Sequence, residues 1–148
     1  MMDYKRYQAE LRVLNEKMMP NSFKFFDMDT NKPYVLMAAV TNRGRRNREV
    51  YTLRIDLDEF PYDVPHVETT KMLYTKSGKA LDSGQSGMHC TYNLYGGTGI
   101  CHYGSSWSPS ISLYKVFIKC RLWLEMYEEH LQSGMPIGYY LKEDKGYE

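Results

Sequence analysis

Cys101 stands in a glycine-rich stretch, GGTGICHYGSSWSPS, that covers residues 96–110. A cysteine in such a stretch could act as a nucleophile, because a thiolate attacks acyl carbons readily and the thioester that forms keeps its acyl-transfer potential. Acyl transfer also needs a donor that stabilises an oxyanion, and a side-chain amide can supply it. Asn93, eight residues before Cys101, is the candidate for that donor.

The histidines offer no evident base for this cysteine. A hydrolase would need a histidine that is held by a third group and aimed at the thiol. His102 follows Cys101 directly in the chain, which is a poor geometry for taking its proton. The positions of His66, His89 and His130 in the chain fix no geometry toward Cys101. We therefore interpret His102 as a neighbour of the nucleophile and not as its general base.

Other roles for Cys101 stay open at this point. The dipeptides His-Cys at 89–90 and Cys-His at 101–102 offer four zinc ligands, but adjacent side chains diverge and rarely bind one ion together. A disulfide between Cys90 and Cys101 is disfavoured in a reducing compartment. Simple burial explains Cys101 poorly, since no apolar stripe there requires a small hydrophobic residue. The nucleophile is the favoured interpretation.

Composition limits the classes of protein that the chain can belong to. Its 148 residues fit one domain, residues 1–148, and the formal charge of +1 gives no field that favours nucleic acid or a membrane surface. The longest apolar run, YVLMAAV, is too short to cross a bilayer, and the N-terminus has no apolar region typical of a secretory signal. Three cysteines do not suggest a disulfide framework. We expect a cytoplasmic protein without nucleic-acid or membrane partners.

The elements before Cys101 predict a helix and a sheet. Residues 3–18 have the apolar spacing of an amphipathic helix, with Asp3 as its N-cap. Strand-like runs separated by turn sequences follow, and their short connections favour an antiparallel meander. The four predicted strands cover residues 22–28, 34–40, 49–57 and 66–73. The arginines at 43, 45, 46 and 48 fall in a predicted hairpin loop, where solvation is the simplest role for them.

The elements around and after Cys101 predict a loop and a long helix. Residues 74–100 show little periodicity, which is typical of a functional or mobile segment. Ser108-Pro109 has the residue types of a helix start, and Gly134 those of a helix end. Cys120 lies on the apolar stripe between them, where core packing explains it.

The tail at 141–148 is expected to fray. Together the elements predict an α+β domain whose helices are segregated from the sheet.

The stretch YNLYGGTGICHYGSSWSPSISLYKVFI, residues 92–118, resembles the active-site segment of ubiquitin-conjugating enzymes. In that family an Asn precedes the catalytic Cys by eight residues, and a Trp-Ser-Pro follows the Cys. Asn93, Cys101 and the Trp107-Ser108-Pro109 sequence match these positions. Upstream, YTLRIDLDEFPYDVPHVETT at residues 51–70 resembles the third strand of the family, its proline-rich turn and the next strand.

The chain also departs from the family pattern. Thr91-Tyr92 replaces the usual His-Pro before the Asn, and TKSGKALDSGQSG at residues 75–87 resembles an insertion. SGMPIGYYLKEDKGYE follows the long helix, so we expect the two C-terminal helices common in eukaryotic members to be missing. The ending CRLWLEMYEEHLQSGMPIG is similar to that of bacterial relatives in ubiquitin-like conjugation operons linked to phage defence. The acidic residue that helps to deprotonate the incoming lysine in eukaryotic members has no match.

The resemblance implies a fold and an activity. The expected fold is that of the ubiquitin-conjugating family, with an N-terminal helix, a four-stranded meander, a cysteine-bearing loop and a long closing helix. An activating enzyme would pass the C-terminal acyl group of a ubiquitin-like protein to Cys101 as a thioester, and an amine of a target, most often lysine, would then attack it. ATP would be used by the activating enzyme, so the chain itself would need no metal or cofactor.

The resemblance also implies roles for single residues. Asn93 would hold the oxyanion or order the loop, and Trp107 would pack beneath the loop. Tyr92 and His102 would support the active site. The activating enzyme would dock on the basic face of the first helix, at Lys5, Arg6 and Arg12, although a solvated surface explains that face almost as well.

Two alternatives belong to other functional classes. A non-catalytic binding scaffold of the same fold could hold a ubiquitin-like partner, but such variants lack the cysteine. A zinc-bound structural module would use His89, Cys90, Cys101 and His102.

Overall fold

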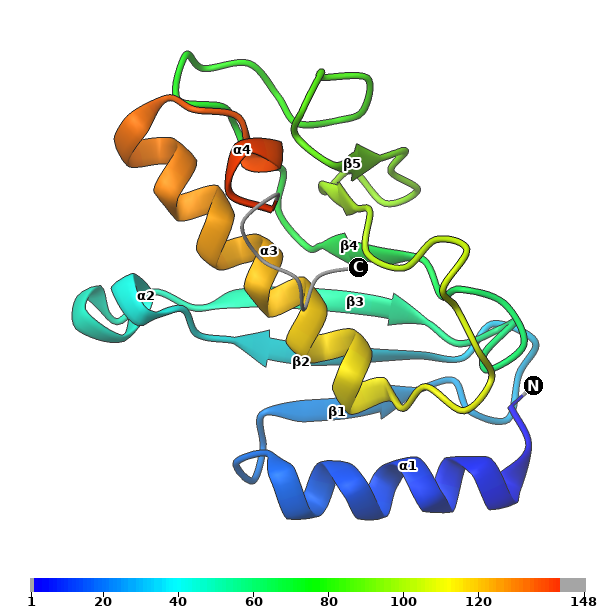
Figure 1. Ribbon diagram of the computed structural model, residues 1–148. Coiled ribbons are helices and arrows are strands. Elements are labelled where there is room, and N and C mark those ends of the chain that lie inside the picture. Colours follow the sequence, from blue (N-terminus) through cyan, green and yellow to red (C-terminus); the bar gives the residue numbers. More distant parts are fainter. Residues whose placement is uncertain (1, 142–148) are drawn as a thin grey trace.

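A six-stranded antiparallel sheet forms the centre of the computed structural model, which describes residues 2–141 (Figure 1). The strand order across the sheet is β1-β2-β3-β4-β6-β5. The strands are β1 (Phe23–Phe26), β2 (Tyr34–Ala39), β3 (Tyr51–Asp56), β4 (Val67–Thr69), β5 (Cys90–Thr91) and β6 (Gly99–Ile100). The helices are α1 (Tyr4–Lys17), α2 (Asn42–Asn47), α3 (Leu113–Ser133) and α4 (Ile137–Leu141).

Side chains of the central strands β2 and β3 point alternately to the two faces of the sheet, and in β2 every second residue is fully buried. Met37 of β2 pairs with Leu53 of β3, and Val35 pairs with Ile55, so these four side chains lie on one face of the sheet. All four are fully buried, and α3 crosses that face (Figure 1). Burial of such side chains contributes about 1.5–3 kcal/mol each. The predicted four-stranded meander is confirmed, and the two short strands β6 and β5 extend it.

The predicted N-terminal helix is confirmed as α1. The side chain of its N-cap, Asp3, accepts a hydrogen bond from the Arg6 backbone N–H at 3.0 Å, which satisfies one of the unpaired donors at the helix start. Leu14 is completely buried, and α1 packs against α3. The α+β class, the N-terminal helix and the long helix are therefore as expected from the sequence.

Two predicted elements differ from the structure. The arginine-rich stretch forms the short helix α2 instead of a hairpin loop, because Thr41 caps it by accepting from the Gly44 N–H at 2.9 Å. The long helix begins at Leu113 and not at Pro109, because Ser112 acts as the N-cap and accepts from the Lys115 N–H at 3.1 Å.

The segment from residue 74 to residue 100 is more regular than predicted, since it contains β5 and β6. After α3, which ends at Gly134 as predicted, the chain forms the short helix α4. The prediction of a frayed tail concerns 141–148, of which 142–148 lie outside the described residues. Within residues 2–141, no helix has the length and apolarity needed to cross a membrane.

Candidate functional site

Cys101 lies directly after β6, and its side chain is exposed. Its backbone N–H donates to the carbonyl of His89 at 3.0 Å, so the ladder between β5 and β6 continues up to the cysteine. Simple burial, which explains Cys101 poorly from the sequence, is excluded by the structure because the side chain is exposed. A solvent-facing thiol on the end of a hydrogen-bonded strand has the access that a nucleophile requires.

The other two cysteines lie in different surroundings. Cys90 is half-buried, and burial, followed by the charges of Cys101 and Asp82, raises the pKa of its thiol to about 12. Cys120 is completely buried in α3, and burial raises the pKa of its thiol further. Core packing explains Cys120, as the sequence predicts. Of the three thiols, only that of Cys101 is exposed.

Asn93 lies on the loop that joins β5 to β6, and its side chain closes that loop. The Asn93 Nδ2 donates to the carbonyl of Gly97 at 3.0 Å. Gly97 lies four positions before Cys101 in the chain. Of the two roles considered for Asn93, this contact favours ordering of the loop over direct contact with an oxyanion at Cys101.

Glu68 is a residue of the site that sequence reasoning missed. It lies in β4, only 1% exposed, beneath the 93–97 loop. Its Oε1 accepts from the backbone N–H of Leu94 at 2.7 Å, and its Oε2 accepts from the N–H groups of Tyr95 at 2.9 Å and Gly97 at 2.8 Å. The alternation of strand β4 gives no hint of this role, because the partners lie 26–29 residues away.

Aromatic side chains bracket the same loop. Tyr92 is exposed, and its ring stacks on the imidazole of His66 at a centroid distance of 5.0 Å. The Tyr95 hydroxyl donates to Asp56 Oδ2 at 2.9 Å, while the Arg54 guanidinium lies 3.8 Å from the Tyr95 ring centroid. Burial and the neighbouring Asp56 raise the pKa of Tyr95 above its ordinary value. The predicted supporting residue Tyr92 thus packs at the side of the loop.

His102 points into the protein and not to the solvent. Its Nε2 lies 2.8 Å from the carbonyl of Pro65, which fixes this nitrogen as the donor and leaves the buried Nδ1 without a hydrogen bond. Burial lowers the pKa of His102 to about 4, against the opposing effect of the Pro65 bond. The imidazole is therefore neutral near pH 7, which agrees with a supporting role.

Trp107 connects the segment after Cys101 to the proline-rich turn. Its Nε1–H donates to the carbonyl of Pro61 at 3.0 Å. Its ring packs against Phe60 and Tyr103, with centroid distances of 6.1 and 5.5 Å. This packing holds the chain between the cysteine and α3 against residues 60–61.

The three basic residues predicted for partner binding divide into two groups. Lys5 and Arg12 are exposed on α1. The Arg6 guanidinium instead pairs with Glu10 and donates to the carbonyl oxygens of Pro109 at 2.6 Å and Ile111 at 2.9 Å. Arg6 therefore connects α1 to the segment before α3 by hydrogen bonds.

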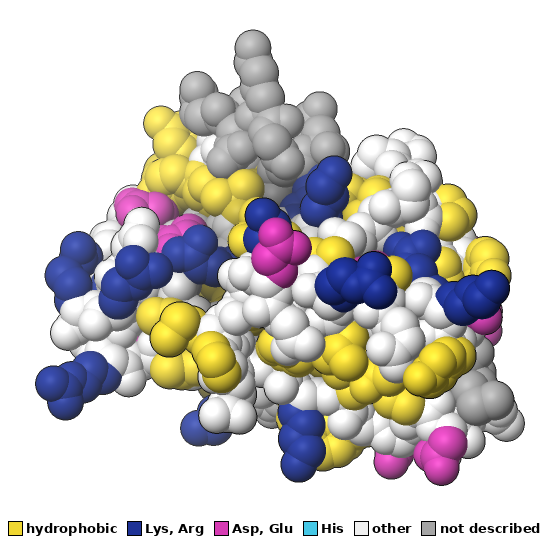
Figure 2. Space-filling view, turned by 90° about the horizontal axis from the view of Figure 1, so that it is seen from below, with side chains coloured by type: hydrophobic (Ala, Val, Ile, Leu, Met, Phe, Trp, Pro, Cys, Tyr) yellow, Lys and Arg dark blue, Asp and Glu magenta, His cyan; other side chains and the backbone are white. Residues whose placement is uncertain are grey.

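The face on the α1 side carries Lys and Arg side chains scattered among hydrophobic and uncharged ones (Figure 2). At its left-hand end lies α2, the arginine-rich helix (Figures 1 and 2). Basic side chains are thus spread over this face and do not mark α1 alone.

Zinc has no evident ligand set here. Within residues 2–141, no three His, Cys, Asp or Glu side chains are grouped so that they could hold a metal ion. The zinc interpretation of residues 89, 90, 101 and 102 is therefore not supported, and the bond from His102 to Pro65 gives a physical reason.

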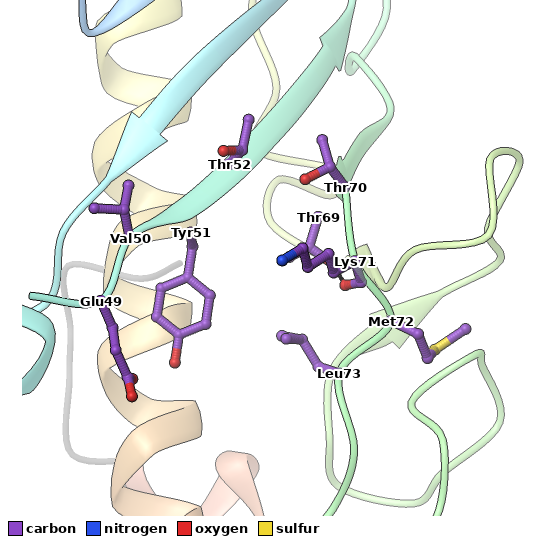
Figure 3. A pocket seen from close by; sticks show the side chains of 9 residues that line it. All are labelled: Glu49, Val50, Tyr51, Thr52, Thr69, Thr70, Lys71, Met72 and Leu73. Atoms are coloured by element: carbon purple, nitrogen blue, oxygen red, sulfur yellow. Dashed lines mark hydrogen bonds between the residues drawn. The ribbon is translucent and has the colours of Figure 1, made fainter.

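A cleft of about 500 Å³ opens elsewhere, where β3 and the chain after β4 diverge (Figure 3). Its described lining runs over residues 49–52 and 69–73 and includes none of the predicted site residues.

No protein-family model matches the chain, and no curated protein matches it with significance. The residues and their geometry are therefore what indicates a function for the chain.

Proposed function

We propose that the chain is a ubiquitin-like-protein-conjugating enzyme of the ubiquitin-conjugating fold that uses Cys101 as its nucleophile. The observation that carries the proposal is the exposed Cys101 thiol at the end of β6, with Asn93 ordering the loop before it and Trp107 packed after it. The order of helix, antiparallel meander, cysteine segment and long helix also supports it. A bacterial conjugation system linked to phage defence, in the cytoplasm, is the setting that the resemblance implies.

The proposed reaction has two acyl transfers. In the first, the Cys101 thiolate attacks the thioester carbonyl of the charged activating enzyme; a new C–S bond forms, and the thiolate of the activating enzyme leaves. In the second, a neutral amine of the target attacks the Cys101 thioester. A C–N bond forms, the C–Sγ bond breaks, and the amine proton passes to a solvent base. The chain needs no cofactor for either step.

The non-catalytic scaffold remains the alternative in a different class. A scaffold would bind a ubiquitin-like protein without a covalent bond to it. The exposed thiol favours the enzyme, because a scaffold has no use for a reactive cysteine at the end of a strand.

The test combines the chain with ATP, an activating enzyme and a ubiquitin-like protein. We expect a thiol-labile adduct on a non-reducing gel. Cys101→Ser should convert it to a thiol-resistant oxyester or abolish it, and Cys101→Ala should abolish it. Formation of the thiol-labile adduct by Cys101→Ala would overturn the assignment.

A further inference from the structure

The carboxylate of Glu68 accepts hydrogen bonds from the backbone of the 93–97 loop, which precedes β6. Three N–H groups, those of Leu94, Tyr95 and Gly97, converge on its two oxygens at 2.7–2.9 Å. His66 contributes a fourth contact through its Nε2, 2.9 Å from Oε1. An extended hairpin would direct these N–H groups to different sides, so the carboxylate selects one curled conformation of the loop.

The carboxylate is ionised in these surroundings. Burial acts to raise the pKa of Glu68, but the bonds from His66 and from the three backbone N–H groups outweigh it, and the pKa lies below its ordinary value. Hydrogen bonds to an ionised acceptor are roughly twice as strong as those between neutral groups. A buried carboxylate without such partners would be costly, so the loop and the charge depend on each other.

Glu68 also connects the 93–97 loop to β6, the strand directly before Cys101. Glu68 pairs with Gly99 in the sheet, two residues before Cys101. Gly97 lies so close to β4 that a Cβ on it would come within 1.6 Å of the Thr69 carbonyl oxygen. The 93–97 loop, which Asn93 closes, and strand β6 are thus both held against the same part of β4, at residues 68–69.

We propose that Glu68 is a positioning residue for acyl transfer from Cys101, because its carboxylate holds the 93–97 loop, and with it Asn93, in the shape that attack by the amine requires. Glu68 does not touch the reacting atoms and acts through the loop. The proposal rests on the proposed function of Cys101. It differs from a purely stabilising role, which would affect loading of the cysteine and transfer to the amine alike.

Hydrogen exchange of the backbone amides tests the geometry without any reaction. We expect the amides of Leu94, Tyr95 and Gly97 to exchange at least about tenfold more slowly than that of Gly96, which Glu68 does not contact. Glu68→Gln should remove most of this protection. Equal exchange at all four amides in the wild-type chain would overturn the proposal even if Glu68→Gln fails to fold.

Kinetics test the role in transfer. Cys101 is acylated with a synthetic peptide thioester that ends in Gly-Gly, and the purified adduct is treated with free lysine. We expect Glu68→Gln to slow this aminolysis about tenfold, while the rate of acylation changes less than twofold. Glu68→Asp keeps the charge but withdraws it by one methylene. Its rate of aminolysis should therefore lie between the rates of the wild type and of Glu68→Gln. Glu128→Gln, which alters a buried carboxylate on α3, serves as the matched control and should leave aminolysis unchanged.

A double variant separates this proposal from the proposed function. In the Asn93→Ala background, Glu68→Gln should slow aminolysis less than twofold further, because both residues act through one loop. A full tenfold additional loss, or equal losses in acylation and aminolysis, would overturn the positioning role alone. No effect of Asn93→Ala, together with no enzyme-dependent charging of Cys101, would overturn the proposed function, and the role of Glu68 with it.

Discussion

Cys101 and Cys120 are the same residue type, nineteen positions apart, in opposite surroundings. Cys120 lies on the buried face of α3, where burial raises the pKa of its thiol. Cys101 lies at the end of a strand with its side chain exposed. The difference shows that the position in the backbone decides which thiol can react. The face of α3 that is directed into the core keeps Cys120 from solvent, and the position directly after β6 exposes Cys101.

The two regions share a firmly held backbone. Around Cys120 this comes from core packing, and before Cys101 it comes from close backbone contacts at Gly97 and from the bonds of Glu68. The exposed cysteine is therefore supported by an ordered loop. Such a combination suits a group that must receive and then deliver an acyl chain in a fixed geometry.

Thiol alkylation should separate the two cysteines most strongly. With iodoacetamide under native conditions, Cys101 should react at least about 10³-fold faster than Cys120, because Cys120 reacts only after the core opens. Peptide mass spectrometry over time measures both rates. In denaturant the two rates should become similar, and similar rates in the native state would refute the comparison.

Asn93→Ala tests whether the ordered loop matters to the exposed cysteine. Aminolysis of the Cys101 thioester should slow by about 10²-fold, the loss that a misplacement of about 1 Å can cause, because the loop loses its closing contact to Gly97, while acylation is largely retained. Single-turnover discharge of the purified adduct measures it. The exposed Asn31→Ala is the control and should discharge at the wild-type rate; an equal loss there would show that the effect is not specific to the loop.

The burial of Cys90 is intermediate between that of Cys101 and that of Cys120. Because burial raises its pKa to about 12, its thiolate fraction should grow about tenfold per pH unit from pH 8.5 to pH 10.5, and its alkylation rate with it. An ordinary thiol, with a pKa of about 8.5, levels off over the same range. The measurement is alkylation of Cys90 in the wild-type chain, followed by peptide mass spectrometry beside a cysteine peptide; a plateau of the Cys90 rate near pH 9 would contradict the raised pKa.

The smallest expected effect concerns the packing of the loop. Gly97→Ala should lower the free energy of unfolding by about 1–3 kcal/mol, because its Cβ would overlap the Thr69 carbonyl oxygen. Gly104→Ala, where a Cβ meets nothing within 4 Å, should change it by less than about 0.5 kcal/mol. Urea unfolding measures both. Equal stability of the two variants would mean that the loop before Cys101 is loose.

The sequence predicted the elements whose signal is local. An apolar run between turn sequences located β2, alternation of apolar and polar residues located β3, and the cap at Asp3 located the start of α1. The predicted start of α3 was wrong, because Ser108-Pro109 and Ser112 are both residue types that commonly begin a helix. Long-range contacts decided between them: Arg6 donates to two carbonyl oxygens of the 109–111 segment and holds it out of the helix.

The candidate site was predictable only in part. Cys101 could be singled out because glycines and the Trp-Ser-Pro surround it, and the structure agrees that it is exposed. Glu68 could not be found, since its partners are backbone N–H groups, which no residue type marks. Strands of two residues, such as β5 and β6, are too short to leave a periodic pattern.

Identifying the cysteine that carries the acyl group is the most direct test of Cys101 as the nucleophile. Two variants are charged with the activating enzyme, the ubiquitin-like protein and ATP, and intact mass is measured before and after thiol treatment. One variant keeps only Cys101 (Cys90→Ser with Cys120→Ala), and the other lacks only Cys101 (Cys101→Ala). We expect one thiol-labile modifier on the first and none on the second. A thiol-labile adduct on the variant that lacks only Cys101 would contradict the assignment of Cys101 as the nucleophile.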